Sequence, residues 1–303
     1  AFSATTEDIP PLGSGVYTWT VTDANGCSAN ASFNVGQPGL FSVSGVAGTF
    51  TGGWNVSCAG GNNGSIDMTV SGGTMPYTHA WTGPGGFTSS ALDLTGLPAG
   101  AYTYVLTDAN GCSVSASFDL TEPTPIVLTT NGVQQITCNG DANASIDVTA
   151  SDSTAPLAYA WSGPGSYSAS TASINNLAPG TYSLVVSDAN GCTDGGTNDW
   201  TFVDPAVLDP GAGTTANVSC FGASDGSAAA TVTGGVAPYS ISWNTTPVQT
   251  GATATGLTAG TYTVTVTDAR GCSRTGNVTI AQPAAVLSAS IGAQTNVLCF
   301  GNS

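Results

Sequence analysis

The stretch GTYTVTVTDARGC, residues 260–272, decides the fold of this chain of 303 residues. Its apolar residues Tyr262, Val264 and Val266 alternate with threonines, which is typical of a β-strand with one face in a core. The following Asp-Ala-Arg-Gly predicts a tight turn, because the aspartate side chain caps it and the glycine accepts the positive φ that closes it. The stretch therefore predicts a half-buried strand and a hairpin.

This stretch occurs in four copies, about 80 residues apart. The earlier copies are GVYTWTVTDANGC, GAYTYVLTDANGC and GTYSLVVSDANGC, which end at Cys27, Cys112 and Cys192. A second cysteine motif recurs at the same spacing, as in NVSCAG around Cys58 and NVSCFG around Cys220. A fixed period of this length indicates tandem structural units. The predicted division is a partial repeat of C-terminal strands at 1–38, full repeats at 39–123, 124–205 and 206–283, and the start of another repeat at 284–303.

Each full repeat has the content of a β-sandwich of the immunoglobulin type. About six or seven short strands fit into one repeat, and one tryptophan lies on an inner strand. The tryptophans predicted to anchor the cores are Trp81, Trp161 and Trp243. Pro-containing links, such as the one at Pro123, separate the repeats. We therefore predict an all-β chain of tandem immunoglobulin-like β-sandwich modules that form an extended rod.

The charge composition excludes several classes of function. The chain carries 18 acidic residues against two arginines and no lysine, for a net charge of −16. A nucleic-acid partner would require a basic surface, and Schiff-base or P-loop chemistry would require a lysine. A single histidine excludes a repeated His-based metal site or triad, and no repeat carries an acid–base pair of its own. We predict a protein that is not an enzyme, without catalytic residues or cofactors, and without a membrane span in this segment.

Eight cysteines, two in each repeat, predict disulfides in an oxidising, extracellular compartment. Three pairing schemes stay open. Pairing within repeats joins Cys58–Cys112, Cys138–Cys192 and Cys220–Cys272, and pairing across repeat boundaries joins Cys58–Cys192 and Cys138–Cys272. The preferred scheme folds the chain back at the Pro-containing links, because the two cysteine motifs of one sandwich lie a strand length apart, roughly 20 to 30 Å. It joins Cys27–Cys58, Cys112–Cys138, Cys192–Cys220 and Cys272–Cys299.

The aspartates of the four turns are the candidate metal ligands: Asp23, Asp108, Asp188 and Asp268. Acidic rods of tandem sandwiches often bind calcium at their junctions through oxygen ligands. Turn capping also explains one aspartate per hairpin, and nothing in the sequence matches an EF-hand loop. Turn capping is the preferred interpretation, and calcium is the weaker one.

The order of the motifs resembles the SprB repeat. Residues 220–283 show it most fully, with CFGASDGS, GGVAPYSISW, GLTAGTYTVTVTDARGC and AQP. The resemblance implies a very large cell-surface protein of gliding Bacteroidetes, exported by the type IX system, of the kind that includes their mobile adhesin. It implies no particular ligand and no catalytic residue. The second repeat departs from the pattern, because SDSTAPLAYAW at 151–161 lacks the Gly-Gly pair and the tyrosine that directly follows the proline in the other repeats.

The resulting hypothesis is a segment of a large extracellular adhesin or surface filament on a bacterial cell. The segment would act as a structural spacer that carries mechanical load or as a fibre-forming array, with neighbouring copies or repeats of the same protein as its partners. The alternative is an array of glycan-binding modules that binds surface glycans through avidity. That alternative predicts a row of exposed aromatic residues at equivalent positions of the repeats, whereas the repeated aromatic residues look like core residues. Trp54 and Trp200, outside the repeat pattern, are the better candidates for an exposed contact.

Overall fold

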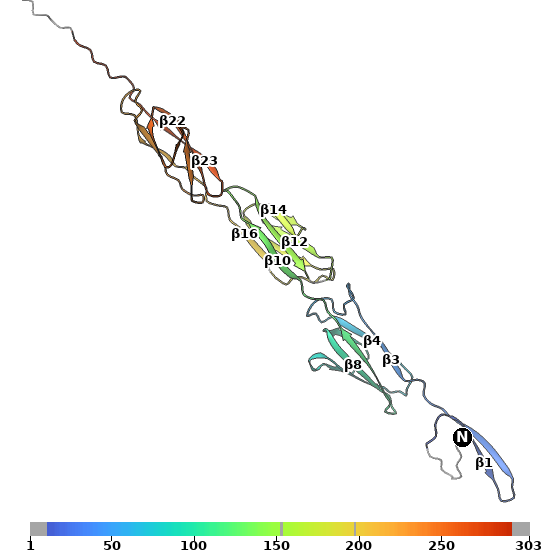
Figure 1. The fold of residues 1–303 in the computed structure, drawn as a ribbon. Helices are drawn as coiled ribbons and strands as arrows, with labels where there is room; N and C mark the ends of the chain where they lie inside the picture. Colours follow the sequence, from blue (N-terminus) through green and yellow to red (C-terminus); the bar gives the residue numbers. More distant parts are fainter. Residues whose placement is uncertain (1–10, 152–153, 197, 293–303) are drawn as a thin grey trace, which may run out of the picture. The chain divides into compact units, whose positions relative to one another are not determined.

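The computed structural model describes residues 11–151, 154–196 and 198–292 (Figure 1). In these ranges the chain is built from short strands, and helix is limited to the 3-10 turns η1 (Pro84–Gly86) and η2 (Pro164–Ser166). No helix in the described part of the chain is long and apolar enough to cross a bilayer. The chain forms two compact units. The first consists of Ala1–Val127, Ala150–Ala158 and Val186–Gly195, and the second of Leu128–Thr149, Tyr159–Val185 and Gly196–Ser303.

The first complete sandwich has seven strands: β3 (Ser42–Ala47), β4 (Gly64–Ser71), β5 (Thr78–Thr82), β6 (Thr88–Ser89), β7 (Leu94–Leu97), β8 (Gly100–Thr107) and β9 (Ser113–Leu120). They form a three-stranded sheet in the order β3-β4-β7 and a four-stranded sheet in the order β6-β5-β8-β9. Buried residues of both sheets make one core, so the sheets face each other. Two antiparallel sheets around one core are the immunoglobulin-type architecture.

The two following repeats have the same topology. The second has sheets β10-β11-β14 and β13-β12-β15-β16, and the third has β17-β18-β21 and β20-β19-β22-β23. A further hairpin precedes them, formed by β1 (Gly15–Thr22) and β2 (Ser28–Val35). The strands of the second sandwich are β10 (Val127–Gln134), β11 (Ala144–Ser151), β12 (Ala158–Gly163), β13 (Tyr167–Ala169), β14 (Ser173–Leu177), β15 (Gly180–Ser187) and β16 (Asn198–Phe202). Those of the third are β17 (Ala212–Ala216), β18 (Gly226–Ala230), β19 (Ser240–Trp243), β20 (Gln249–Thr250), β21 (Thr253–Leu257), β22 (Gly260–Thr267) and β23 (Ser273–Ile280).

The alternation read from the sequence sets which face of each strand is buried. On β22, Val264 and Val266 are fully buried, whereas the side chain of Thr261 is exposed. On β8, Tyr102 and Tyr104 are buried in the same way. Because successive side chains of a strand point to opposite faces, one apolar row is sufficient to build one half of a core. The predicted all-β class of tandem immunoglobulin-like sandwiches is confirmed.

The three repeated tryptophans lie in the cores. Trp81, Trp161 and Trp243 are at most 3% exposed. Each indole N–H donates, at 2.9 to 3.1 Å, to a backbone carbonyl just after the next strand, which is β6, β13 or β20. A buried indole needs such an acceptor, since an unpaired N–H in a core costs free energy.

The two tryptophans proposed as exposed contacts do not form a free aromatic surface. Trp200 on β16 packs against Trp161, with ring centroids 5.3 Å apart, and is half-buried. Trp54 is also half-buried, and its backbone carbonyl accepts the N–H of Phe50 at 2.8 Å. The expectation that these rings would be exposed is wrong, because both residues are half-buried and Trp200 packs against the core tryptophan of its own repeat.

A tyrosine corner explains the Gly-x-Tyr motif at the start of the penultimate strand of each repeat. The hydroxyl of Tyr102 donates to the carbonyl of Pro98, four residues upstream, at 3.0 Å. The same bond, at 2.9 to 3.2 Å, is made by Tyr17, Tyr182 and Tyr262. This bond is a hallmark of immunoglobulin-type sandwiches, and composition and periodicity did not predict it.

Candidate functional site

The site begins with four hairpins that carry the Asp-Ala-Asn/Arg-Gly-Cys sequence, here called the Asp-Cys hairpins: residues 23–27, 108–112, 188–192 and 268–272. In the second of them, Oδ1 of Asp108 accepts the backbone N–H groups of Asn110 and Cys112, each at 2.9 Å. Its Oδ2 accepts the N–H of Thr74 from the turn between β4 and β5, at 3.0 Å. Gly111 closes the turn with a φ of +82°. The aspartate therefore shapes the hairpin and ties it to a neighbouring turn.

The other two complete sandwiches repeat this arrangement. Asp268 accepts the N–H groups of Arg270, Cys272 and Val236, each at 2.9 Å. Burial by itself raises the pKa of Asp108 and of Asp268, but the backbone N–H donors outweigh burial and hold both pKa values below the usual value. These carboxylates are therefore ionised at neutral pH and act as hydrogen-bond acceptors.

The four turn aspartates were also the calcium candidates. Asp108, Asp188 and Asp268 are almost fully buried, and Asp23 accepts the N–H groups of Asn25 and Cys27 at 2.9 and 2.8 Å. Their oxygens accept hydrogen bonds from backbone N–H groups of their own turns and, in the three complete sandwiches, of a neighbouring turn. Within residues 11–151, 154–196 and 198–292, no group of three or more His, Cys, Asp or Glu side chains is arranged to hold a metal ion. The arrangement is that of turn capping.

The second part of the site is a loop before the second strand of each sandwich, here called the cysteine loop: residues 55–63, 135–143 and 217–225. In the first loop, the N–H of Val56 donates to the carbonyl of Thr121 at 3.0 Å, and the N–H of Gly60 donates to Oε2 of Glu122 at 2.8 Å. The corresponding acceptors for the other loops are the side chains of Asp204 and Gln282. The residue before each link proline therefore fixes the cysteine loop to the end of its own sandwich.

Two disulfides join cysteine loops to Asp-Cys hairpins. Cys58 bonds to Cys192 and Cys138 bonds to Cys272, with Cα–Cα distances of 5.5 and 5.6 Å. Each bond connects the loop of one repeat to the hairpin of the next, over a sequence separation of 134. The first bond lies within the first compact unit and the second within the second unit. The structure therefore has the pairing across repeat boundaries.

The preferred pairing of Cys27–Cys58, Cys112–Cys138, Cys192–Cys220 and Cys272–Cys299 is wrong. It required the chain after each link proline to fold back along the preceding strand. Instead β10 pairs with β11, in the next sandwich, so the chain continues forward past Pro123. Pairing within a repeat is also wrong. The cysteine loop lies where β9 ends and Cys112 lies where β9 begins, about 27 Å away along eight residues of strand.

The remaining cysteines are free thiols where the structure describes them. Cys27, Cys112 and Cys220 are unpaired and exposed, whereas the four bonded cysteines are half-buried. Cys299 lies outside the described residues. Two of the exposed thiols belong to Asp-Cys hairpins, and the third belongs to a cysteine loop.

Polar contacts surround the disulfide between Cys58 and Cys192. The side-chain amide of Asn190 donates to the carbonyls of Thr51 and Ser57 at 3.1 and 3.3 Å, and its Oδ1 accepts the N–H of Thr51 at 3.2 Å. The sulfur of Cys192 lies 3.1 Å from the carbonyl oxygen of Ser57. The hairpin is therefore held by its asparagine as well as by the covalent bond.

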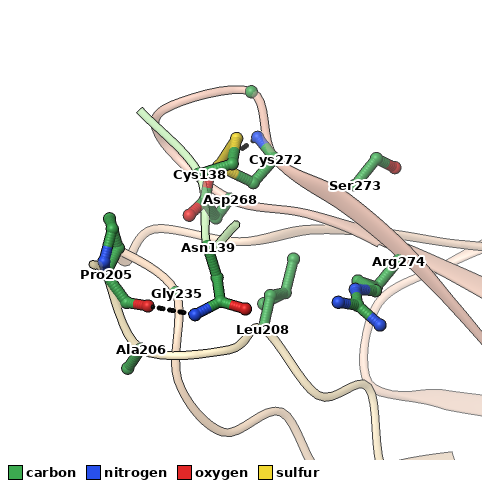
Figure 2. A pocket seen from close by; sticks show the side chains of 11 residues that line it. Cys138, Asn139, Pro205, Ala206, Leu208, Gly235, Asp268, Cys272, Ser273 and Arg274 are labelled. Carbon is green, nitrogen blue, oxygen red and sulfur yellow. Dashed lines mark hydrogen bonds between the residues drawn. A yellow bond between two sulfur atoms is a disulfide. The ribbon is translucent and has the colours of Figure 1, made fainter. Parts of the chain in front are cut away.

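The second disulfide has a different polar partner. Arg270 replaces the asparagine and donates from Nη1 to the carbonyl of Ile136 at 3.2 Å. Figure 2 shows the pocket beside this bond, where Asn139 donates to the carbonyl of Pro205 at 2.9 Å. Asp268, the carboxylate in this pocket, already accepts three backbone N–H groups. The pocket thus lies beside the junction of loop and hairpin, and its Asn139 and Asp268 side chains already have hydrogen-bond partners.

Comparison with protein families gives three matches to one family, the SprB repeat, at residues 54–86, 130–166 and 212–247. The chain contains SprB repeats. Each match begins at or before a cysteine loop and runs past the buried tryptophan of the same sandwich. The cysteine loop and the buried tryptophan of each sandwich therefore lie within the matched segments. A comparison with functionally curated proteins gave no match.

Several solved structures are similar to this chain at low sequence identity. Three N-terminal domains of the bacteriophage RB49 outer capsid protein Hoc are 13% identical, with a TM-score of 0.41, over 80% of this chain and all of that one. A fragment of a 1.5-MDa bacterial ice-binding adhesin is 14% identical, with a TM-score of 0.43, over 80% of this chain and 97% of that one. The eight N-terminal Ig domains of Down Syndrome Cell Adhesion Molecule are 13% identical, with a TM-score of 0.40, over 89% of this chain and 40% of that one. Similarity at this level adds nothing on function to what the sheets show.

Proposed function

We propose that this chain is a segment of a large extracellular adhesin or surface filament, in which SprB repeats form an extended rod that spaces and carries mechanical load. The single observation that supports the proposal most is the pairing of Cys58 with Cys192 and of Cys138 with Cys272. A disulfide between successive repeats limits how far the repeats separate under tension.

Three features support an extracellular compartment and a bacterial host. Disulfides are typical of extracellular proteins, because the reducing cytosol keeps most thiols free. A chain with 18 acidic residues and two arginines has a net negative charge, which favours solubility and disfavours binding to other polyanions. Together with the SprB repeats, these features support export to the surface of a gliding bacterium through the type IX system, and neighbouring copies or repeats as partners.

The glycan-binding alternative is not favoured by a specific observation. An array that binds through avidity would present the same aromatic side chain from each repeat. The aromatic residues that repeat at equivalent positions, Trp81, Trp161 and Trp243, are buried and hydrogen-bonded in the cores. They serve the fold.

Small-angle X-ray scattering of the oxidised chain tests the rod. Three sandwiches placed end to end, each roughly 40 Å long with its loops, give a radius of gyration of about 35 Å. A chain of this length packed into one globule would give about 19 Å. A value of about 35 Å or more is expected, since the hairpin of β1 and β2 lengthens the rod further, and a value near the globular one would overturn the proposed spacer function.

A further inference from the structure

We propose that the free edge of β10 (Val127–Gln134) is an interaction surface that pairs antiparallel with β10 of a second copy of this chain. The proposal deepens the proposed filament function and rests on it for one point, that copies of this chain are neighbours. It gives the second sandwich a role in lateral association that the protected edges of the other two sandwiches do not have.

The open edge of β10 belongs to a repeat that has a neighbour on each side. The order of its sheet is β10-β11-β14, and within residues 11–151, 154–196 and 198–292 no strand pairs with β10 on the side away from β11. A strand edge presents backbone N–H and C=O groups that can bind another strand. Because sandwiches of this chain precede and follow the second one, its edge is open in a repeat whose neighbours are both present.

The strand at this edge is long and accessible. All of its eight residues except Leu128 are exposed. The exposed fractions of Val127 and Val133 are 48% and 42%, and a Cβ at Gly132 would meet no atom within 4 Å. The strand is therefore accessible along its length on the side away from β11.

The corresponding edges of the other two sandwiches are protected. Strand β3 has six residues, and its Gly45 lies so close to β9 that a Cβ would be 2.7 Å from the ring of Phe118. Strand β17 has five residues and a register shift between Thr214 and Ala216, and the hydroxyl of Thr214 donates to the carbonyl of Thr279 on β23 at 2.9 Å. Short strands, irregular register and cover by other elements are the usual means by which proteins prevent strand edges from pairing.

The cover of an edge strand comes from the last strand of its own sandwich. In the first and third sandwiches the last strands, β9 and β23, have eight residues each and contact the edge strands β3 and β17. The last strand of the second sandwich, β16, has five residues and begins only at Asn198. A last strand of this length leaves more of the edge beside it uncovered, which agrees with the exposure of β10.

Charge does not oppose the pairing of β10 with itself. None of its eight residues is charged, and the chain contains no lysine, a residue that commonly prevents association at strand edges. The net charge of −16 acts between copies over longer distances, and salt at about 0.15 M screens it beyond about 8 Å. Two copies of this edge can therefore approach each other.

The residue order of β10 favours a second copy as the partner. An antiparallel pair of identical strands has a two-fold axis, and both copies contribute the same contacts. With the axis at Thr130, the opposed pairs are Thr130–Thr130, Thr129–Asn131, Leu128–Gly132 and Val127–Val133. The polar side chains then lie opposite polar side chains, and valine lies opposite valine.

The sheets of this chain already contain threonine pairs of this kind. Across β15 and β16, the hydroxyl oxygens of Thr181 and Thr201 lie 2.9 Å apart, and across β22 and β23 those of Thr261 and Thr279 lie 3.3 Å apart. Threonines opposite each other stabilise antiparallel strands. A pair of β10 strands would make the same contact between two copies.

The contact is small, so the expected dimer is weak. One pair of eight-residue strands is smaller than the standard protein–protein interface of about 1,600 Å². On a surface where many copies are held side by side, the high local concentration favours such a contact. In solution the dimer is therefore expected at high concentration.

The experiment uses the full chain with C27S, C112S, C220S and C299S, which removes the cysteines outside the two disulfides and so prevents covalent dimers. The test variant adds Thr130→Lys on β10. The control adds Ser44→Lys, which puts the same charge on an exposed residue of the edge strand β3. Sedimentation velocity over a range of concentrations gives the dimer dissociation constant of each chain. Amide hydrogen exchange of the chain without an added lysine, at low and at high concentration, locates the contact.

We expect a concentration-dependent dimer whose dissociation constant rises about tenfold or more in Thr130→Lys, because two lysines then face each other at the two-fold axis. Ser44→Lys should keep the dissociation constant within about twofold of the parent value. Exchange of the β10 amides that point away from β11 should slow by about tenfold at high concentration, and exchange in β17 should stay unchanged.

A chain that stays monomeric at every concentration would overturn the proposal, as would a dimer in which the β10 amides are not protected. Equal dissociation constants for Thr130→Lys and Ser44→Lys would overturn it as well. Equal melting temperatures of the two variants show that both are folded, and the exchange measurement tests the contact on a chain without either lysine. None of these outcomes affects the spacer function, which the scattering of the single chain at low concentration tests separately.

Discussion

Removing the two disulfides should increase the contour length of the unfolded chain, and the increase for both together should exceed the sum of the increases for each alone. The substitutions are C192S, which removes the bond to Cys58, and C272S, which removes the bond to Cys138. The two bonds interlock, because Cys138 lies inside the segment closed by the first bond and Cys192 lies inside the segment closed by the second. A force applied at the chain ends therefore takes the shortest covalent path through both.

The lengths follow from the numbering and from about 3.6 Å per extended residue. With both bonds present, the shortest path between them is the stretch from Cys138 to Cys192, which extends to about 190 Å. With one bond removed, the shortest path is the stretch from Cys58 to Cys138 or from Cys192 to Cys272, and each extends to about 290 Å. With both removed, the full stretch from Cys58 to Cys272 extends to about 770 Å. Each single substitution thus releases about 90 Å and the pair releases nearly 600 Å.

The assay is single-molecule force spectroscopy on the chain pulled from its two ends, after all sandwiches have unfolded. The contour length of the fully unfolded oxidised chain is compared with that of C192S, C272S and the double variant, and the reduced chain gives the upper limit. An additive release of about 190 Å per substitution is the result that pairing within repeats would give, and it would refute the interlocked arrangement.

Four further predictions concern the sandwiches. Tyr102→Phe removes the hydrogen bond to Pro98 and should lower the free energy of unfolding, measured by urea titration, by about 1 kcal/mol. An unchanged free energy of unfolding would contradict a tyrosine corner. Gly226→Ala should cost about 1–3 kcal/mol, because its Cβ would lie 2.7 Å from Ile280 and 2.9 Å from the Leu257 carbonyl, whereas the control Gly213→Ala meets nothing within 4 Å and should be neutral. The pKa of Asp108 is lower in the folded state, so the stability that the ionised carboxylate contributes is present above about pH 4 and is lost as the pH falls through the folded pKa. Asp108→Asn should therefore make the melting temperature fall less steeply as the pH is lowered. An unchanged fall at acid pH would contradict this. Calcium chelation should leave the melting temperature unchanged, and a clear drop would instead support calcium at the turn aspartates.

The sequence was informative where a local rule applies. Alternation of Tyr262, Val264 and Val266 with threonines is a property of one strand, and a turn capped by Asp268 is a property of a few adjacent residues. Both are set by chain geometry and so are visible without the fold. Repetition then extended each local prediction to every repeat.

Other features of the site had no local signal. Glu122 stands before a link proline and looks like ordinary surface charge, yet it accepts the N–H of Gly60, 62 residues away. The asparagine of the Asp-Cys hairpin looks like a turn residue, yet Asn190 binds Thr51 and Ser57 of the preceding repeat. Such contacts depend on which ends of two sandwiches meet.

By itself the sequence determined the repeat, the all-β sandwich, the buried tryptophans and the pairs of cysteine motifs, because each depends on periodicity or on side chains a few residues apart. Only the tertiary structure decided the partners of Cys58 and Cys138, since a disulfide requires Cα atoms about 4.4 to 6.8 Å apart and sequence spacing does not report distance in space. The length of β9 separates the two cysteines of one repeat, and the forward path past Pro123 brings the next hairpin to the loop. The strand lengths and the direction of the link therefore decide that the covalent bonds run between repeats.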